Sequence, residues 1–136
     1  MRILLFHIRF SGILMLFLAL IHLGFPRRFG WKKEFKPLSL LSNQLMYIHT
    51  FFIALTVFLF GLLCLFCAPE LMENNRLAHS IALLLAVFWG LRSIFQFFVY
   101  SPALWRGKKL ETSLHIAFSI LWLYFTFVFT SLFLLA

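Results

Sequence analysis

The chain has 136 residues and a formal net charge of +8, and hydrophobic residues make up 63% of it. Charged residues account for only 12%, and phenylalanine alone occurs 20 times. An ordinary soluble domain is roughly 45–50% apolar and about 25% charged. A soluble chain this short has too much surface for its volume to bury so many phenylalanines. The composition therefore excludes a soluble enzyme, a secreted disulfide scaffold and a disordered tail, and it indicates an integral membrane protein.

Four stretches of the chain are long and apolar enough to cross a bilayer, which takes about 20 residues as a helix. We expect helices over residues 3–25, 45–67, 77–100 and 113–135. A proline follows each of the first three stretches, and Ser42-Asn43 marks the start of the second helix. Short loops make neighbouring helices antiparallel. The sequence thus predicts an all-α membrane protein with one domain over residues 1–136, folded as an up-down antiparallel four-helix bundle.

The basic residues are concentrated in two of the three loops between these helices. They are Arg27, Arg28, Lys32, Lys33 and Lys36 in the first loop and Arg106, Lys108 and Lys109 in the third. The positive-inside rule places both loops in the cytoplasm and both termini on the non-cytoplasmic side. We accordingly expect a multi-pass protein of a bacterial inner membrane, with the lipid bilayer and not nucleic acid as the partner of its positive charge.

A polar stripe interrupts the third predicted span. Arg92 lies about 12 Å from the cytoplasmic end of this span at 1.5 Å per residue. A cation at that depth costs about 2.5–3.5 kcal/mol on the insertion scale. Gln96 and Tyr100 follow at intervals of four residues and share its helical face. We therefore expect all three side chains to face the interior of the bundle.

Three histidines are expected at the same level of the membrane. His22 lies near the cytoplasmic end of the first span, and His49 and His115 lie near the cytoplasmic ends of the second and fourth. Each is within roughly 10 Å of the same interface, given the rise of a helix. Every helix thus contributes a polar group to one layer. Histidine, glutamine and arginine can also simply hydrogen-bond helices to one another in a membrane, and this structural interpretation remains an alternative.

The residue types in this layer suit a cofactor. Imidazole ligates heme iron and transition metals, and a guanidinium can bind a heme propionate through two hydrogen bonds. The predicted cofactor-binding residues for heme b or a transition metal ion are His49, His115, His22, Arg92, Gln96 and Tyr100. The predicted metal ligands are His22, His49 and His115. The chain contains no Asp, which argues against a calcium, magnesium or carboxylate-bridged di-iron site.

The function that we predict from these residues is redox chemistry with a lipid-soluble partner such as a quinone. Two alternatives stay open: a non-catalytic subunit that anchors or assembles a larger membrane complex, and a pathway for protons or solutes. A pathway would require a homo-oligomer, because four helices offer no obvious pore. The sequence leaves open whether the protein is an enzyme.

A further motif is Cys64-Leu65-Phe66-Cys67 at the outer end of the second span. Its spacing places both sulfur atoms on one helical face. It resembles in outline the quinone-linked disulfide oxidases, which are also four-helix membrane proteins with an outward-facing Cys-x-x-Cys. Those enzymes use a second cysteine pair, and this chain has only two cysteines. We therefore interpret both as small buried apolar residues. The size and number of spans are also similar to the small four-helix membrane protoporphyrinogen oxidases, in architecture alone.

Overall fold

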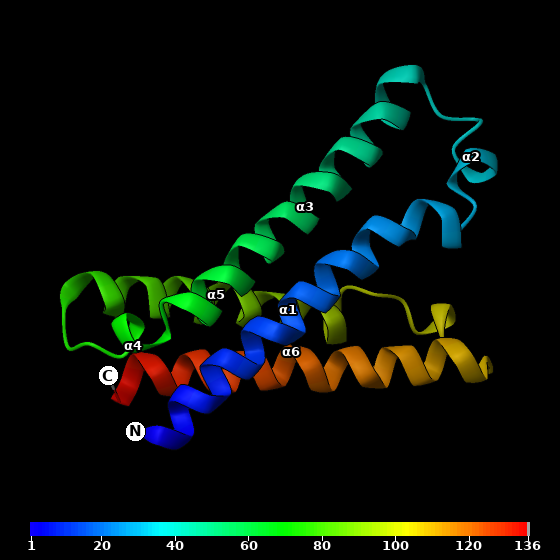
Figure 1. Ribbon diagram of the computed structural model, residues 1–136. Coiled ribbons are helices and arrows are strands. Elements are labelled where there is room, and N and C mark those ends of the chain that lie inside the picture. The colour runs from blue at the N-terminus through cyan, green and yellow to red at the C-terminus, as the bar shows by residue number, and fades with distance from the viewer. Residues whose placement is uncertain (136) are drawn as a thin grey trace. The chain divides into compact units, whose positions relative to one another are not determined.

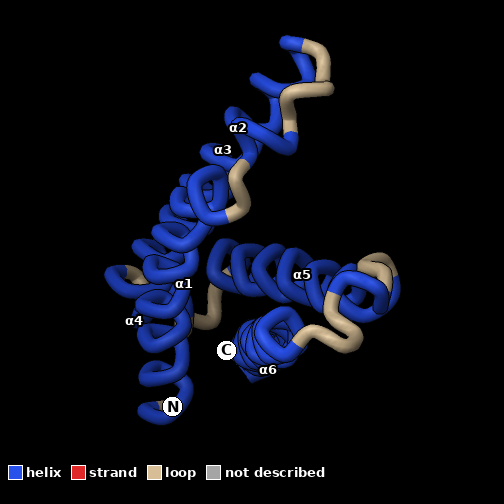
Figure 2. The backbone as a smooth tube through the Cα atoms, turned by 90° about the vertical axis from the view of Figure 1, so that its right-hand side faces the viewer, coloured by secondary structure: helices blue, strands red, loops and turns tan. Residues whose placement is uncertain are grey.

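The computed structural model describes residues 1–135, which form helices joined by short loops and contain no strand (Figures 1 and 2). In chain order the helices are α1 (Arg2–Arg28), α2 (Trp31–Glu34), α3 (Leu40–Phe66), α4 (Ala68–Leu71), α5 (Arg76–Phe98), the 3₁₀ helix η1 (Pro102–Leu104) and α6 (Lys109–Leu135). Four of them, α1, α3, α5 and α6, are long and apolar enough to cross a membrane. The all-α, multi-pass membrane protein predicted from the sequence is confirmed.

The ends of the α1–α3 hairpin differ from those predicted. Helix α1 continues through Pro26 for two residues, and the backbone then turns at Gly30 with a φ of 62°. Glycine is favoured there because it has no Cβ to clash in the left-handed region. Helix α3 begins at Leu40, ahead of the predicted Ser42-Asn43, because the side chain of Ser39 accepts a hydrogen bond from the backbone N–H of Ser42.

Helix α5 is shorter than the predicted third span. Asn75 caps its start by accepting a hydrogen bond from the N–H of Ala78 at 2.9 Å. The helix ends at Phe98, so Tyr100 lies in the turn that follows instead of on the helix itself. Helix α6 starts at Lys109, four residues before its predicted start. The first difference shortens the third span and the second lengthens the fourth, and the apolar centre of each span is unchanged.

The chain divides into two compact units. One unit is Ile8–Ala68 and contains most of α1 together with α2 and α3. The other combines Met1–His7 with the chain from Pro69 onward and contains α5 and α6. Each unit is thus built on a pair of membrane-spanning helices. The four-helix bundle and the side of the membrane on which the termini lie stay predictions.

In the first unit α1 and α3 touch backbone to backbone at two glycines. A Cβ atom on Gly12 would lie 2.8 Å from the carbonyl oxygen of Gly61, and one on Gly61 would lie 2.9 Å from that of Gly12. Buried residues continue along α3 from this crossing at intervals of three or four, namely Ala54, Val57 and Cys64. Small residues at such a crossing let two helices in lipid approach closely and gain dispersion energy. The glycine pair therefore fixes where α1 and α3 cross.

In the second unit α5 and α6 lie side by side in both views (Figures 1 and 2) and pack through aromatic side chains. The rings of Trp89 and Trp122 stack with centroids 5.2 Å apart and planes 13° apart. Phe125 packs against Trp89 at 4.6 Å. All three residues are at most 3% exposed. This cluster forms the apolar centre of the pair, and the polar side chains described below lie beside it.

We expect Gly12→Ala and Gly61→Ala each to lower the thermal unfolding midpoint of the purified protein in detergent. Alanine normally stabilises a helix relative to glycine, but here the added methyl group must push two backbones apart. Such overpacking costs typically about 1–3 kcal/mol.

Gly24→Ala is the matched control, because a Cβ at Gly24 meets nothing within 4 Å. The control variant should unfold at the wild-type temperature or slightly above it. Equal midpoints for all three variants would show that α1 and α3 do not depend on the glycine contact.

Candidate functional site

A chain of hydrogen bonds crosses from α5 to α6 through the side chain of Gln96. The Oε1 atom of Gln96 accepts from Arg92 Nη1 at 3.3 Å and from Trp122 Nε1 at 3.3 Å. Its Nε2 atom lies 2.8 Å from Nδ1 of His115. Gln96 is only 6% exposed and Trp122 only 3%, so water has little access to these bonds. Three of the predicted site residues, Arg92, Gln96 and His115, are thus brought together.

The hydrogen bonds around Gln96 select the tautomer of His115. Arginine and the indole nitrogen of tryptophan can only donate hydrogen bonds, so the amide oxygen must face Arg92 and Trp122. The amide nitrogen therefore donates to His115 Nδ1, which accepts the bond. An imidazole that accepts at Nδ1 is neutral and carries its proton on Nε2. The lone pair on Nδ1 of His115 is therefore already bonded to Gln96, and its Nε2 presents an N–H donor.

Arg92 keeps its positive charge among aromatic rings. Its guanidinium carbon lies 4.8 Å from the centre of the Trp122 ring and 5.5 Å from that of Tyr100. The faces of these rings attract the cation, and the oxygen of Gln96 adds a dipole. None of these three partners carries a negative charge. The geometry thus holds the guanidinium in place without neutralising it.

A groove of about 400 Å³ opens beside this arginine. Phe88, Leu91 and Phe95 form its apolar wall, and Arg92 and Tyr100 supply its polar groups. Tyr100 was predicted on the helical face of Arg92. It reaches the arginine from the turn after α5 instead, and the two residues still meet.

The loop after α5 folds back onto α6 and covers His115. The rings of Trp105 and His115 stack with centroids 3.8 Å apart and planes 6° apart. Thr112 Oγ1 donates to the carbonyl oxygen of Trp105 at 2.6 Å and holds the loop there. In the sequence Trp105 lies between the third and fourth predicted spans, where an aromatic residue is common at a membrane boundary. Its role as a stacking partner of His115 could not be predicted, because the path of the loop is not visible in the local pattern.

One helical turn deeper, a second polar contact joins the two helices. Ser93 Oγ and Thr126 Oγ1 lie 3.1 Å apart. Each hydroxyl also lies near a carbonyl oxygen of its own helix, Ser93 with Trp89 at 3.0 Å and Thr126 with Trp122 at 2.8 Å. Hydroxyl groups of this kind commonly join membrane helices. We assign this pair a structural role.

The other two predicted histidines lie on the α1–α3 pair and bond to their own helices. His22 Nδ1 donates to the carbonyl oxygen of Leu18 at 2.8 Å, and His49 Nδ1 donates to that of Leu45 at 2.9 Å. Within residues 1–135 no three side chains of His, Cys, Asp or Glu come close enough together to hold a metal ion. The metal site of His22, His49 and His115 therefore stays a prediction.

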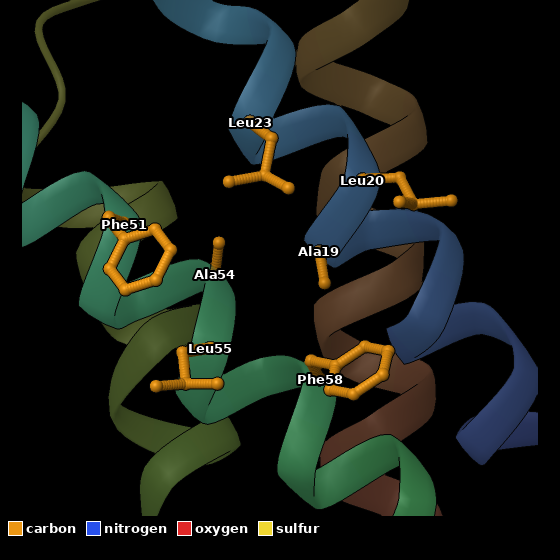
Figure 3. Close-up of a pocket in the computed structure, with 7 residues that line it drawn as sticks. All are labelled: Ala19, Leu20, Leu23, Phe51, Ala54, Leu55 and Phe58. Carbon is orange, nitrogen blue, oxygen red and sulfur yellow. The ribbon is translucent and has the colours of Figure 1, made fainter.

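The α1–α3 pair also contains a cavity of about 160 Å³, lined entirely by apolar side chains (Figure 3). Its lining residues are Ala19, Leu20, Leu23, Phe51, Ala54, Leu55 and Phe58. The close-up shows Ala19 and Ala54 on the two facing helices, where their short side chains leave space. The sequence does not predict this cavity by itself, although two alanines within long apolar runs are a signal for it.

The two cysteines are free thiols, with Cys64 buried and Cys67 half-buried. Cys64 packs at the glycine crossing, since its Cβ would lie 3.2 Å from a Cβ on Gly12. This position agrees with the interpretation of Cys64 as a small buried residue, whereas Cys67 is only half-buried and does not fit that interpretation.

Comparison with known proteins adds no assignment: no protein family, curated protein or solved structure matches the chain.

We expect Gln96→Leu to lower the free energy of unfolding by about 1–3 kcal/mol, the cost of leaving a buried polar group without its partner. The change removes the acceptor of Arg92 and Trp122 and the donor to His115. The free energy of unfolding is measured by equilibrium unfolding in mixed micelles, with tryptophan fluorescence as the signal. Gln44→Leu is the control, because Gln44 is exposed at the start of α3, and it should change the stability little. A loss as large in the control would show that the network contributes nothing specific.

Proposed function

We propose that the protein is a membrane redox protein whose α5–α6 site binds a lipid-soluble partner of the quinone class. The observation that carries the proposal is the groove of about 400 Å³ in which Arg92 and Tyr100 are the polar groups. Its remaining lining residues are apolar and mostly aromatic, as expected for a site that accepts a flat ring from lipid. The bilayer of a bacterial inner membrane is the location that we propose for it.

Arg92 is suited to bind a quinone oxygen. A guanidinium has five N–H donors, and its hydrogen bond within the described residues 1–135 goes to Gln96. The charge that the aromatic rings leave uncompensated would stabilise the oxygen of a quinone as it gains electrons, since charge-assisted hydrogen bonds are about twice as strong as neutral ones. The hydroxyl group of Tyr100 can donate a second hydrogen bond. Gln96 and His115 act through Arg92 as positioning residues.

The groove-binding part of the proposal is tested with Arg92→Gln. We expect the affinity for a water-soluble short-chain quinone to fall at least about tenfold, because a hydrogen bond to a charged group contributes about 1.5–3 kcal/mol. Quenching of tryptophan fluorescence in detergent measures the binding, since Trp122 lies 4.8 Å from the guanidinium.

The matched control is Arg76→Gln, which removes the same charge from the first residue of α5 and does not line the groove. This variant should bind the quinone with wild-type affinity. Equal affinities for wild type and Arg92→Gln, or an equal loss in both variants, would contradict the proposal.

The proposed electron carrier within the chain is heme b or a transition metal ion. His49 supports this part, because its Nδ1 donates to Leu45 and its lone pair is therefore on Nε2, the arrangement usual for a ligating histidine. His22 shows the same bond to Leu18. The neutral His115, with its proton on Nε2, would need to lose its bond from Gln96 or its proton to become a ligand. His49 is thus better placed than His115 to act as a ligand.

Visible spectra of the oxidised and dithionite-reduced protein, with metal analysis of the same sample, test the carrier. We expect a Soret band, or stoichiometric metal, that is lost in His49→Ala and retained in His79→Ala. His79 lies in the first turn of α5, outside the predicted site. A colourless and metal-free protein, purified under conditions that retain membrane cofactors, would refute the carrier and leave the quinone groove to be judged by its own test.

A further inference from the structure

Two cavities lie along the same helix pair, α1 and α3, and differ in chemistry. The first is the apolar cavity of about 160 Å³ in Figure 3. The second has a volume of about 510 Å³ and is lined by Pro26, Arg27, Gly30, Lys32 and Tyr47. Neither cavity belongs to the α5–α6 site.

The register of the two helices places these cavities next to each other. Leu23 lines the apolar cavity and Arg27, four residues later on α1, lines the basic one. On α3, Tyr47 lines the basic cavity and Phe51, four residues later, lines the apolar one. Residues four apart share a helical face and lie about 6 Å apart along the axis. The basic cavity is therefore one turn closer to the α1–α3 connection than the apolar cavity.

The connection itself forms an ordered wall of the basic cavity. Trp31 of α2 is buried, and its ring packs on Phe35 at 4.8 Å and against Tyr47 at 5.5 Å. Gly30, with a φ of 62°, allows the backbone to reverse immediately after α1. This turn carries Lys32 to the same cavity as Arg27. The aromatic contacts thus hold two cations and a phenol around one space.

The charge in this segment is strongly positive. Residues 27–36 contain five basic residues and a single acidic one, Glu34. Lysine, arginine and a tyrosine hydroxyl group are all hydrogen-bond donors, and clustered cations beside a membrane helix attract the phosphate of anionic lipids. A phosphate group is the ligand chemistry that this cavity fits.

We propose that the paired cavities form a binding site for one anionic phospholipid. Its phosphate lies among Arg27, Lys32 and Tyr47, and the beginning of one acyl chain lies against Leu23 and Ala54. The apolar cavity favours a lipid over free phosphate, because a free anion would leave that cavity unused. The site is independent of the proposed quinone groove.

Native mass spectrometry of the full chain, delipidated in an uncharged detergent, tests the headgroup. We expect phosphatidylglycerol to bind more tightly than phosphatidylcholine, and the double variant Arg27→Gln/Lys32→Gln to bind it more weakly by about fivefold for each charge removed. The control is Lys33→Gln/Lys36→Gln, which removes two charges from the same connection but not from the cavity lining. Equal losses in the two double variants, or equal binding of both lipids, would overturn the site, since the attraction would then be diffuse.

A second variant tests the acyl chain. Ala54→Leu fills the apolar cavity and should weaken the binding of phosphatidylglycerol several-fold. The control is Ala117→Leu, at an exposed position of α6, which should leave this binding unchanged. Competition with millimolar inorganic phosphate separates the two sources of the anion. Displacement of the lipid by phosphate, together with unchanged binding in Ala54→Leu, would assign the cavity to free phosphate and overturn the lipid proposal. Wild-type unfolding midpoints in the variants that bind weakly confirm that they are folded.

Discussion

The orientation of one side-chain amide determines the chemistry of the α5–α6 pair. Gln96 faces Arg92 and Trp122 with its oxygen because both neighbours can only donate. The opposite end of the amide must then donate to His115. Through this single residue the position of the guanidinium, the proton on the imidazole and the packing of the tryptophan depend on one another. A change at any of the four alters the hydrogen bonding of the others, as expected of a buried polar network.

The two helix pairs associate by different physical means. In α1 and α3 the contact is a glycine crossing with backbone atoms in direct contact, so dispersion and close approach contribute most. In α5 and α6 large rings fill the interface, and hydrogen bonds at Gln96 and Ser93 lie beside them. Lipid chains are as apolar as the helix surfaces, so exclusion from water drives neither contact. Shape complementarity therefore stabilises one pair, and shape together with polar bonds stabilises the other.

The sequence predicted the spans well because twenty consecutive apolar residues leave few alternatives to a membrane helix. The meeting of Arg92, Gln96 and His115 was predicted in part, since Arg92 and Gln96 share a helical face and the predicted layer contained His115. The contact of Tyr100 was predicted by the wrong route, because a turn and not a continuing helix brings it back. Two contacts could not be predicted from local periodicity. The stacking of Trp105 on His115 depends on the path of a loop, and the Gly12–Gly61 crossing depends on how two helices meet.

A purely structural role for the network explains some of its members better than others. The Ser93–Thr126 contact and the Gln96–Trp122 bond each link α5 to α6, and a role in joining the two helices is enough to explain both. Arg92 differs, because a cation in this position costs about 2.5–3.5 kcal/mol and a neutral residue could donate to Gln96 without that cost. Its guanidinium lies over the rings of Trp122 and Tyr100, and an open groove lies beside it. A purely structural role does not require a charge, an aromatic contact and a groove at this position, whereas the proposed quinone site would use all three.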